Sequence, residues 1–109
     1  MNLLFNTNSI CAAEAALGRP FVDMIAELES RSGPSLSTLR ALLAAGVMAA
    51  QYPKMPYAFI DVEQAGRLID EHGVPAVGAE VGKSLRAYFE NKTAGAEMAD
   101  LVEEVADGN

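Results

Sequence analysis

The most tempting site for chemistry in this chain surrounds His72, its only histidine. The stretch from Asp61 to His72 has the length of a calcium loop and carries Asp61, Glu63 and Gly66 at suitable positions. Its fifth position is Ala65, however, and its last is the histidine, where calcium needs a bidentate Glu. Zinc takes four ligands from Cys, His or acidic residues, and no second ligand of the right kind lies near His72. We therefore expect no metal, and a histidine that bonds to carbonyls at a helix end.

Two further arrangements invite a catalytic interpretation. Cys11 is the only cysteine, and a cysteine nucleophile needs a base, but the single histidine is far away in the sequence. Cys11 lies within the apolar run 10–13, so we expect it to be buried as a small hydrophobic residue. The acidic pairs at 70–71 and 103–104 are adjacent on predicted helices, where neighbouring side chains point about 100° apart and do not converge on one atom. We predict a protein without catalysis or cofactor.

The elements that would position any site follow from composition. The 109 residues have room for one domain. Half of the residues are hydrophobic, yet only 6% are aromatic and Trp is absent, so the core must consist of Ala, Leu, Val, Ile and Met. Such a core is typical of closely packed helices.

The charge balance excludes one class of partner. The formal net charge is -7, which works against a phosphate-binding surface, because such a surface needs clustered Lys and Arg. We expect no nucleic-acid partner.

No run approaches the roughly 20 apolar residues that span a bilayer, and no signal-peptide pattern is present. The single cysteine fits a reducing compartment, so we expect the protein in the cytosol of the cell that makes it.

Apolar spacing and capping residues predict an all-α fold, a compact bundle of about five short helices. Residues 1–6 are expected to form one short strand or an extended segment. We expect the helix that starts at Ser35 to be central, because it is apolar nearly all round from Ala41 to Ala50. In the helix that starts at Pro20, we expect the acidic residues Asp23, Glu27 and Glu29 to face water. The predicted helices run from caps at 6–9 to Leu17, from Pro20 to about Leu28, from Ser35 to Ala50, from Asp61 to Gly73 and from Pro75 to about Glu90.

The junction between the last two of these helices is encoded in full. Asp61 and Gln64 have the spacing of a capping box, and Gly73 can end a helix in a left-handed conformation. Pro75 then suits the first turn of the next helix. Gly78 and Gly82 share one face of that helix, which predicts close approach of a neighbouring soluble helix from this chain or another.

Two segments are less regular. Residues 52–60 contain two prolines, which predict an extended connection attached to the core through Tyr57, Phe59 or Ile60. Beyond Asn91 the composition becomes acidic, although apolar residues still recur at helical spacing. We divide the chain into a helical domain at 1–91 and an acidic C-terminal helix or tail at 92–109. A helix this short is marginal alone, so it must dock on its own domain or a partner, or fray.

Several segments taken in order resemble the gene transfer agent and phage tail assembly chaperone family, some members of which are labelled phage tail tube proteins. The resemblance covers roughly residues 3 to 90. It is carried by residues 8–14 (NSICAAE) with Gly18, 39–46 (LRALLAAG), 62–70 (VEQAGRLID) and 73–85 (GVPAVGAEVGKSL). The chain departs from the family at its start, where members usually have further residues forming an extended pair, and the acidic tail lies outside the match.

The resemblance implies a helper in phage or gene transfer agent tail morphogenesis, without catalysis or cofactor. It would hold the tape-measure protein or tail tube subunits in an assembly-competent state in the bacterial cytoplasm. The physical mode that fits is a helical body whose apolar groove receives an amphipathic helix, and a homo-oligomer is compatible with it. Candidate partner-binding residues are Tyr52, Met55, Tyr57, Phe59, Gly78, Gly82, Met98, Leu101 and Val105.

Two alternatives remain open from the sequence. The first is a structural tail component, a tube or connector subunit retained in the particle. Tube subunits typically need extensive β structure to form rings, which this chain does not predict. The second is an acidic regulator or antitoxin that mimics nucleic-acid charge, which would bind a basic partner in a salt-sensitive way.

Overall fold

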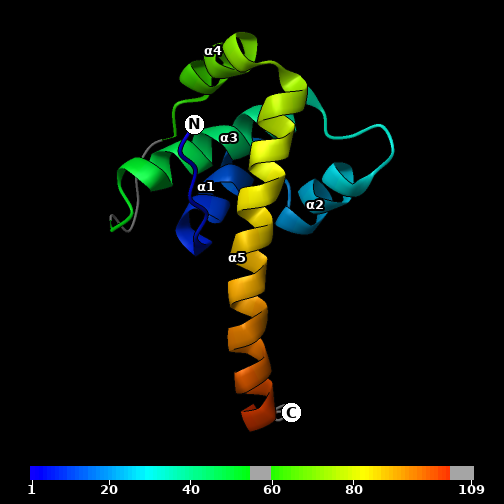
Figure 1. The fold of residues 1–109 in the computed structure, drawn as a ribbon, viewed down its shortest axis with the longest axis vertical. Helices are drawn as coiled ribbons and strands as arrows, with labels where there is room; N and C mark the ends of the chain where they lie inside the picture. Colours follow the sequence, from blue (N-terminus) through cyan, green and yellow to red (C-terminus); the bar gives the residue numbers. More distant parts are fainter. Residues whose placement is uncertain (55–59, 104–109) are drawn as a thin grey trace.

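The computed structural model describes the backbone of residues 1–54 and 60–103, and the side chains of residues 1–54 and 60–90. Within these ranges the chain forms helices and no strand (Figure 1). The predicted all-α bundle of about five helices is confirmed. The helices are α1 (Thr7–Leu17), α2 (Phe21–Glu29), α3 (Leu36–Gln51), α4 (Val62–His72) and α5 (Val74–Glu103).

Helix α3 is the centre of the bundle, as predicted. It packs against α1, α4 and α5, and between Thr38 and Ala49 only Arg40 and Val47 are not fully buried. The hydroxyl of Ser35 caps the helix by accepting a hydrogen bond from the Thr38 N–H at 3.2 Å. Buried apolar side chains from every helix complete the core around α3: Phe5, Ile10, Met24, Leu39, Leu42, Leu43, Ile60, Ile69, Val77, Val81 and Leu85.

The segment before α1 is extended but pairs with no second strand in the part of the chain that the structure describes. The Leu4 N–H instead donates to the carbonyl oxygen of Gly46 at 3.1 Å, and Phe5 is buried beside it. Helix α1 then begins with a reciprocal capping box, in which the Asn6 side chain accepts from the Ser9 N–H and the Ser9 hydroxyl accepts from the Asn6 N–H. The start of the chain is therefore fixed to both α3 and α1.

A polar clasp joins the start of α2, its end and the start of α3. The Glu27 carboxylate forms an ion pair with Arg19 and accepts a hydrogen bond from the Ser35 N–H at 2.9 Å. Arg19 also donates to the hydroxyl of Thr38 at 3.2 Å. Glu27 is partly exposed and does not face water alone as predicted, because the α2–α3 connection folds back and brings the Ser35 N–H to its carboxylate.

The corner between α4 and α5 lies where it was predicted, but only half of the expected capping box forms and Gly73, with φ 90° and ψ 146°, is not in the αL conformation. Asp61 caps α4 by accepting from the Gln64 N–H at 2.9 Å, which is one half of the expected capping box. Gly73 has a φ of 90°, a conformation that residues with a Cβ rarely adopt. Helix α5 starts at the next residue, with Pro75 in its first turn. Ile60, which precedes α4, is buried in the core, while Tyr57 and Phe59 lie outside the described residues.

Helix α5 runs unbroken from Val74 to Glu103 and is longer than predicted. Its first half packs on the bundle, and its second half continues beyond the other helices (Figure 1). The expected end near Glu90 is wrong because no proline or left-handed glycine stands there to stop the helix. The acidic segment at 92–109 therefore begins inside a helix.

Candidate partner-binding groove

A groove of about 630 Å³ separates α2 from the first half of α5. Its charged residues are Glu29 on α2, and Lys83, Arg86 and Glu90 on α5. The remaining lining is apolar and comes from Ile25 and Leu28 on α2 and from Gly78, Ala79, Gly82, Leu85 and Phe89 on α5. A surface of this kind is suited to an apolar partner with a polar border.

Two glycines leave the α5 side of the groove open, because they have no side chain to fill it. A Cβ built on Gly78 or Gly82 would meet no atom within 4 Å. We predicted that a neighbouring helix approaches these glycines closely, and the described part of the chain places none there. The space beside them is therefore available to another molecule.

Aromatic rings close one end of the groove. Phe21, at the start of α2, stacks on Phe89 of α5 with ring centroids 5.4 Å apart and an interplanar angle of 23°. Tyr88 packs edge-on against Phe89 at 5.7 Å, and its hydroxyl lies 3.0 Å from that of Thr7 on α1. The Phe21–Phe89 stack joins α2 to α5, and the Thr7–Tyr88 contact joins α1 to α5.

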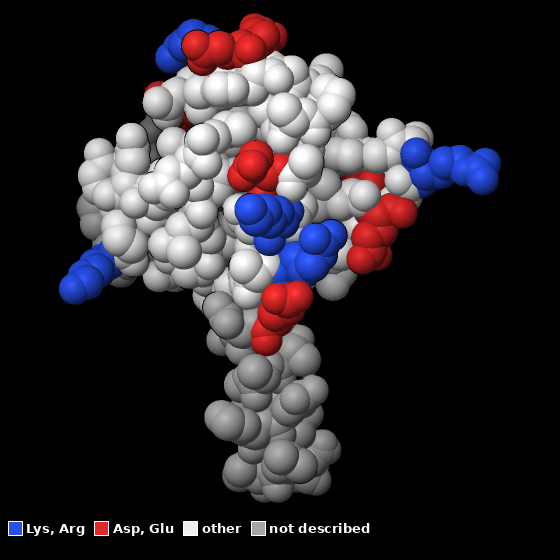
Figure 2. Space-filling view, in the orientation of Figure 1, with Lys and Arg blue, Asp and Glu red and all other residues white. Residues whose placement is uncertain are grey.

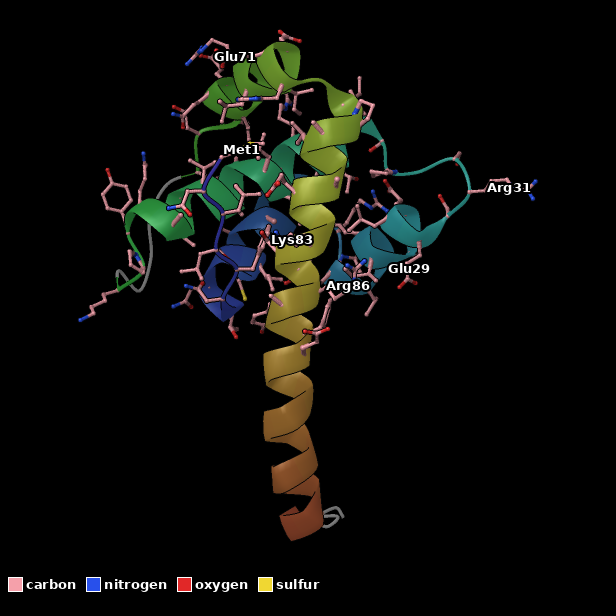
Figure 3. All side chains as sticks on the ribbon, in the orientation of Figure 1. Met1, Glu29, Arg31, Glu71, Lys83 and Arg86 are labelled. Carbon is pink, nitrogen blue, oxygen red and sulfur yellow. The ribbon has the colours of Figure 1, made fainter. Side chains whose placement is uncertain are left out.

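The charges at the groove have no ion-pair partners among the described side chains. The ion pairs among the described side chains join Arg19 to Glu27, and His72 to Glu71 at 4.0 Å, and neither pair includes a residue of the groove. Lys83 and Arg86 are exposed on the front face of α5 in Figure 3, and Glu29 lies on the neighbouring helix α2. Figure 2 shows the same face, with basic side chains at its centre and acidic ones above and below them. A bound partner could pair with these charges without breaking an existing ion pair.

The structure brings together only part of the predicted partner-binding set. Gly78 and Gly82 line the groove. Tyr52 is half exposed at the C-terminal end of α3 and does not belong to it. Met98 and Leu101 are on α5, but their side chains lie outside the described residues. Met55, Tyr57, Phe59 and Val105 lie entirely outside the described residues.

Sequence reasoning missed five apolar residues of the groove, Ile25, Leu28, Ala79, Leu85 and Phe89. Ile25 and Leu28 recur at helical spacing on α2 and are only partly buried. On α5, Phe89 is 37% exposed, Ala79 is exposed and Leu85 is buried. The signal that could have found Ile25 and Leu28 is the width of the apolar stripe of α2, which has four residues, Phe21, Met24, Ile25 and Leu28, of which only Met24 is fully buried.

A second hollow, of about 440 Å³, lies between α3 and α4. It includes Leu36, an apolar residue of the first turn of α3 that is 63% exposed. Arg40 and Arg67 also line it, together with Glu63 and Asp70. This hollow is smaller and more polar than the groove, and it contains none of the predicted partner-binding residues.

The residues considered for catalysis or metal binding do not assemble in the described part of the chain. No group of three or more His, Cys, Asp or Glu side chains there is arranged to hold a metal ion. Cys11 is exposed, so the prediction that it is buried is wrong. Ile10 and Ala13 are on the face of α1 that packs on the core. Position 11 lies about 100° around the helix from position 10, so Cys11 is on another face.

Comparisons of the chain with protein-family models, with curated proteins and with solved structures return no match. None of the described helices combines the length and the apolar content needed to cross a bilayer.

Proposed function

We propose that this protein is a non-catalytic assembly chaperone for a phage or gene transfer agent tail. Its client is the tape-measure protein or a tail tube subunit, held in the bacterial cytoplasm until assembly. The chaperone recognises an amphipathic helix of the client through the groove between α2 and α5.

The observation that carries this proposal is the open apolar groove itself. From Gly78 to Glu90 it follows α5 for about 18 Å, which is close to the length of three helical turns. Its apolar lining suits the buried stripe of an amphipathic helix, and the missing side chains at Gly78 and Gly82 permit a close approach of the client backbone. The charged residues at its border suit the polar edges of such a helix.

Shape and apolar surface are sufficient for this function. A chaperone of this type needs to cover a client segment and release it, so it requires no nucleophile, base or metal. The resemblance to tail assembly chaperones over residues 3 to 90 supplies the identity of the client, and the groove supplies the means of binding.

The test begins with the genes beside the one that encodes this chain, which should include a tape-measure gene. Overlapping fragments of its product, and the tail tube subunit, are co-expressed with the tagged full-length chain and recovered by affinity purification. At least one helical fragment should co-purify at a defined stoichiometry. Recovery of no fragment would refute the proposal.

Two leucine variants locate the binding site. Gly82→Leu fills the groove and should abolish recovery of the fragment. Ala87→Leu is the matched control, since Ala87 is exposed on the same helix but does not line the groove. Equal loss with both variants would place binding elsewhere. Detection of the protein in purified particles by mass spectrometry would favour the structural alternative, because a chaperone should be absent from them.

A further inference from the structure

We propose that, in the absence of a client, the groove between α2 and α5 is occupied by the C-terminal part of α5 from a second copy of this chain. This inference concerns the same groove as the proposed function but does not depend on tape-measure binding. The contact is head-to-tail, so each copy offers one groove and one helical segment.

The reach of α5 makes this contact possible. The helix continues from Asn91 to Glu103, which adds about 20 Å beyond the groove-lining residues, and the groove itself follows α5 for about 18 Å. Because α5 is one continuous helix, this segment cannot return to the groove of its own chain. A second copy is therefore the source of the segment within reach of the groove.

The sequence of the segment complements the apolar lining of the groove and two of its four charged residues. Met98, Leu101 and Val102 recur at helical spacing and can cover an apolar lining. After Lys92 the segment contains no basic residue, and its acidic residues are Glu97, Asp100 and Glu103. Lys83 and Arg86, which have no ion-pair partner among the described side chains, can pair with them, whereas Glu29 and Glu90 of the same lining carry the charge of the segment, so the apolar contact carries the association.

Helix geometry determines the type of assembly. At 100° per residue, positions 98, 101 and 102 are on average about 150° around α5 from position 82. The groove face and the apolar face of the segment are therefore on nearly opposite sides of the helix. Two copies cannot insert their segments into each other along one straight pair of α5 helices, so the contact is heterologous and leads to rings or open chains.

The first measurement is sedimentation velocity of the full-length protein over a wide concentration range. Each chain has a mass of 11.5 kDa, and we expect species larger than a dimer that dissociate on dilution and in high salt. A monomer at every concentration, or a dimer that never grows further, would overturn the inference.

Two full-length variants then separate the two halves of the contact. Gly82→Leu blocks the groove and Leu101→Lys disables the segment, so each alone should associate at least tenfold more weakly than the wild type. Mixed together they should form a one-to-one complex, because the segment of the first fits the groove of the second. Ala87→Leu should behave as the wild type. A mixture that stays monomeric, or a Gly82→Leu protein that associates as strongly as the wild type, would refute the contact.

The same variants keep this inference distinct from the proposed function. Leu101→Lys leaves the groove intact, so it should still recover the client fragment although it no longer associates with itself. If self-association follows the expected pattern and no client is recovered, the head-to-tail contact stands and the chaperone proposal fails. If the client is recovered and every variant is monomeric, the opposite conclusion follows.

Discussion

The ring of Phe5 lies directly against the backbone of Gly46, in the middle of the central helix α3. A Cβ built on Gly46 would be 3.1 Å from Cζ of Phe5 and 3.4 Å from Cβ of Leu3. The lack of a side chain at Gly46 therefore allows the N-terminal segment to pack against the helix backbone. The Leu4 N–H donates to the Gly46 carbonyl at the same place. An aromatic ring and a hydrogen bond therefore replace the strand pairing that the segment lacks.

Gly46→Ala should destabilise the fold. The new methyl group forces the buried ring to move, which costs about 1 to 3 kcal/mol and outweighs the gain of up to about 1 kcal/mol in helix propensity. Gly66→Ala is the control, because its Cβ would meet only Cδ of Arg40 at an ordinary 3.6 Å. Urea unfolding should show a lower free energy of unfolding for the first variant and not for the second. An equal or higher value for Gly46→Ala would contradict the contact.

The Glu27 clasp should make stability depend on pH in the acid range. The Ser35 N–H, and then Arg19 and Thr38, lower the pKa of Glu27 from 4.5 to about 2. Because the folded pKa lies below the unfolded one, the stabilisation is complete above pH 4.5 and is lost as the pH falls toward 2. Glu27→Gln should therefore be less stable than the wild type at pH 7, and the difference should shrink between pH 4.5 and 2.

The measurement is urea unfolding of the wild type and Glu27→Gln at several pH values. Glu29→Gln removes the same charge from the same helix outside the clasp, and it should not reproduce the pH-dependent difference. A difference between wild type and Glu27→Gln that stays constant down to pH 2 would show that the carboxylate is not held as described.

Local signals predicted the frame of this fold well. The caps at Asn6, Ser35 and Asp61 and the glycine at Gly73 mark helix ends, and each acts through atoms within a few residues. Such short-range interactions are encoded in adjacent residues, so they can be recognised before the tertiary structure is known.

The features that sequence missed depend on contacts between distant residues. Glu27 is bound because the connection after α2 returns Ser35 to it, and Phe89 lines a groove because Phe21 stacks on it from another helix. The position of Gly78 and Gly82 on one face was visible, but whether that face is covered depends on where α2 lies. Periodicity identifies an apolar face and does not say how much of it the fold will bury.

Cys11 should react with thiol reagents in the folded protein. Its side chain is exposed on the outer face of α1, so Ellman's reagent should label one thiol per chain without denaturant. The labelling should leave the far-UV circular dichroism spectrum unchanged. Labelling in urea gives the reference rate, and protection of the native thiol by several orders of magnitude would mean that Cys11 is buried after all.

Gly78→Ala should raise stability, in contrast to Gly46→Ala. The glycine lies within α5, where alanine is favoured by up to about 1 kcal/mol, and its Cβ would meet no atom within 4 Å. Urea unfolding of the full-length protein, at a concentration low enough to keep it monomeric, should give a higher free energy of unfolding. The same variant should bind the client fragment more weakly, because the methyl group occupies the groove. A variant that is destabilised would mean that the groove is filled by the chain itself, and one that binds the client as well as the wild type would mean that the glycine face is not part of the binding site.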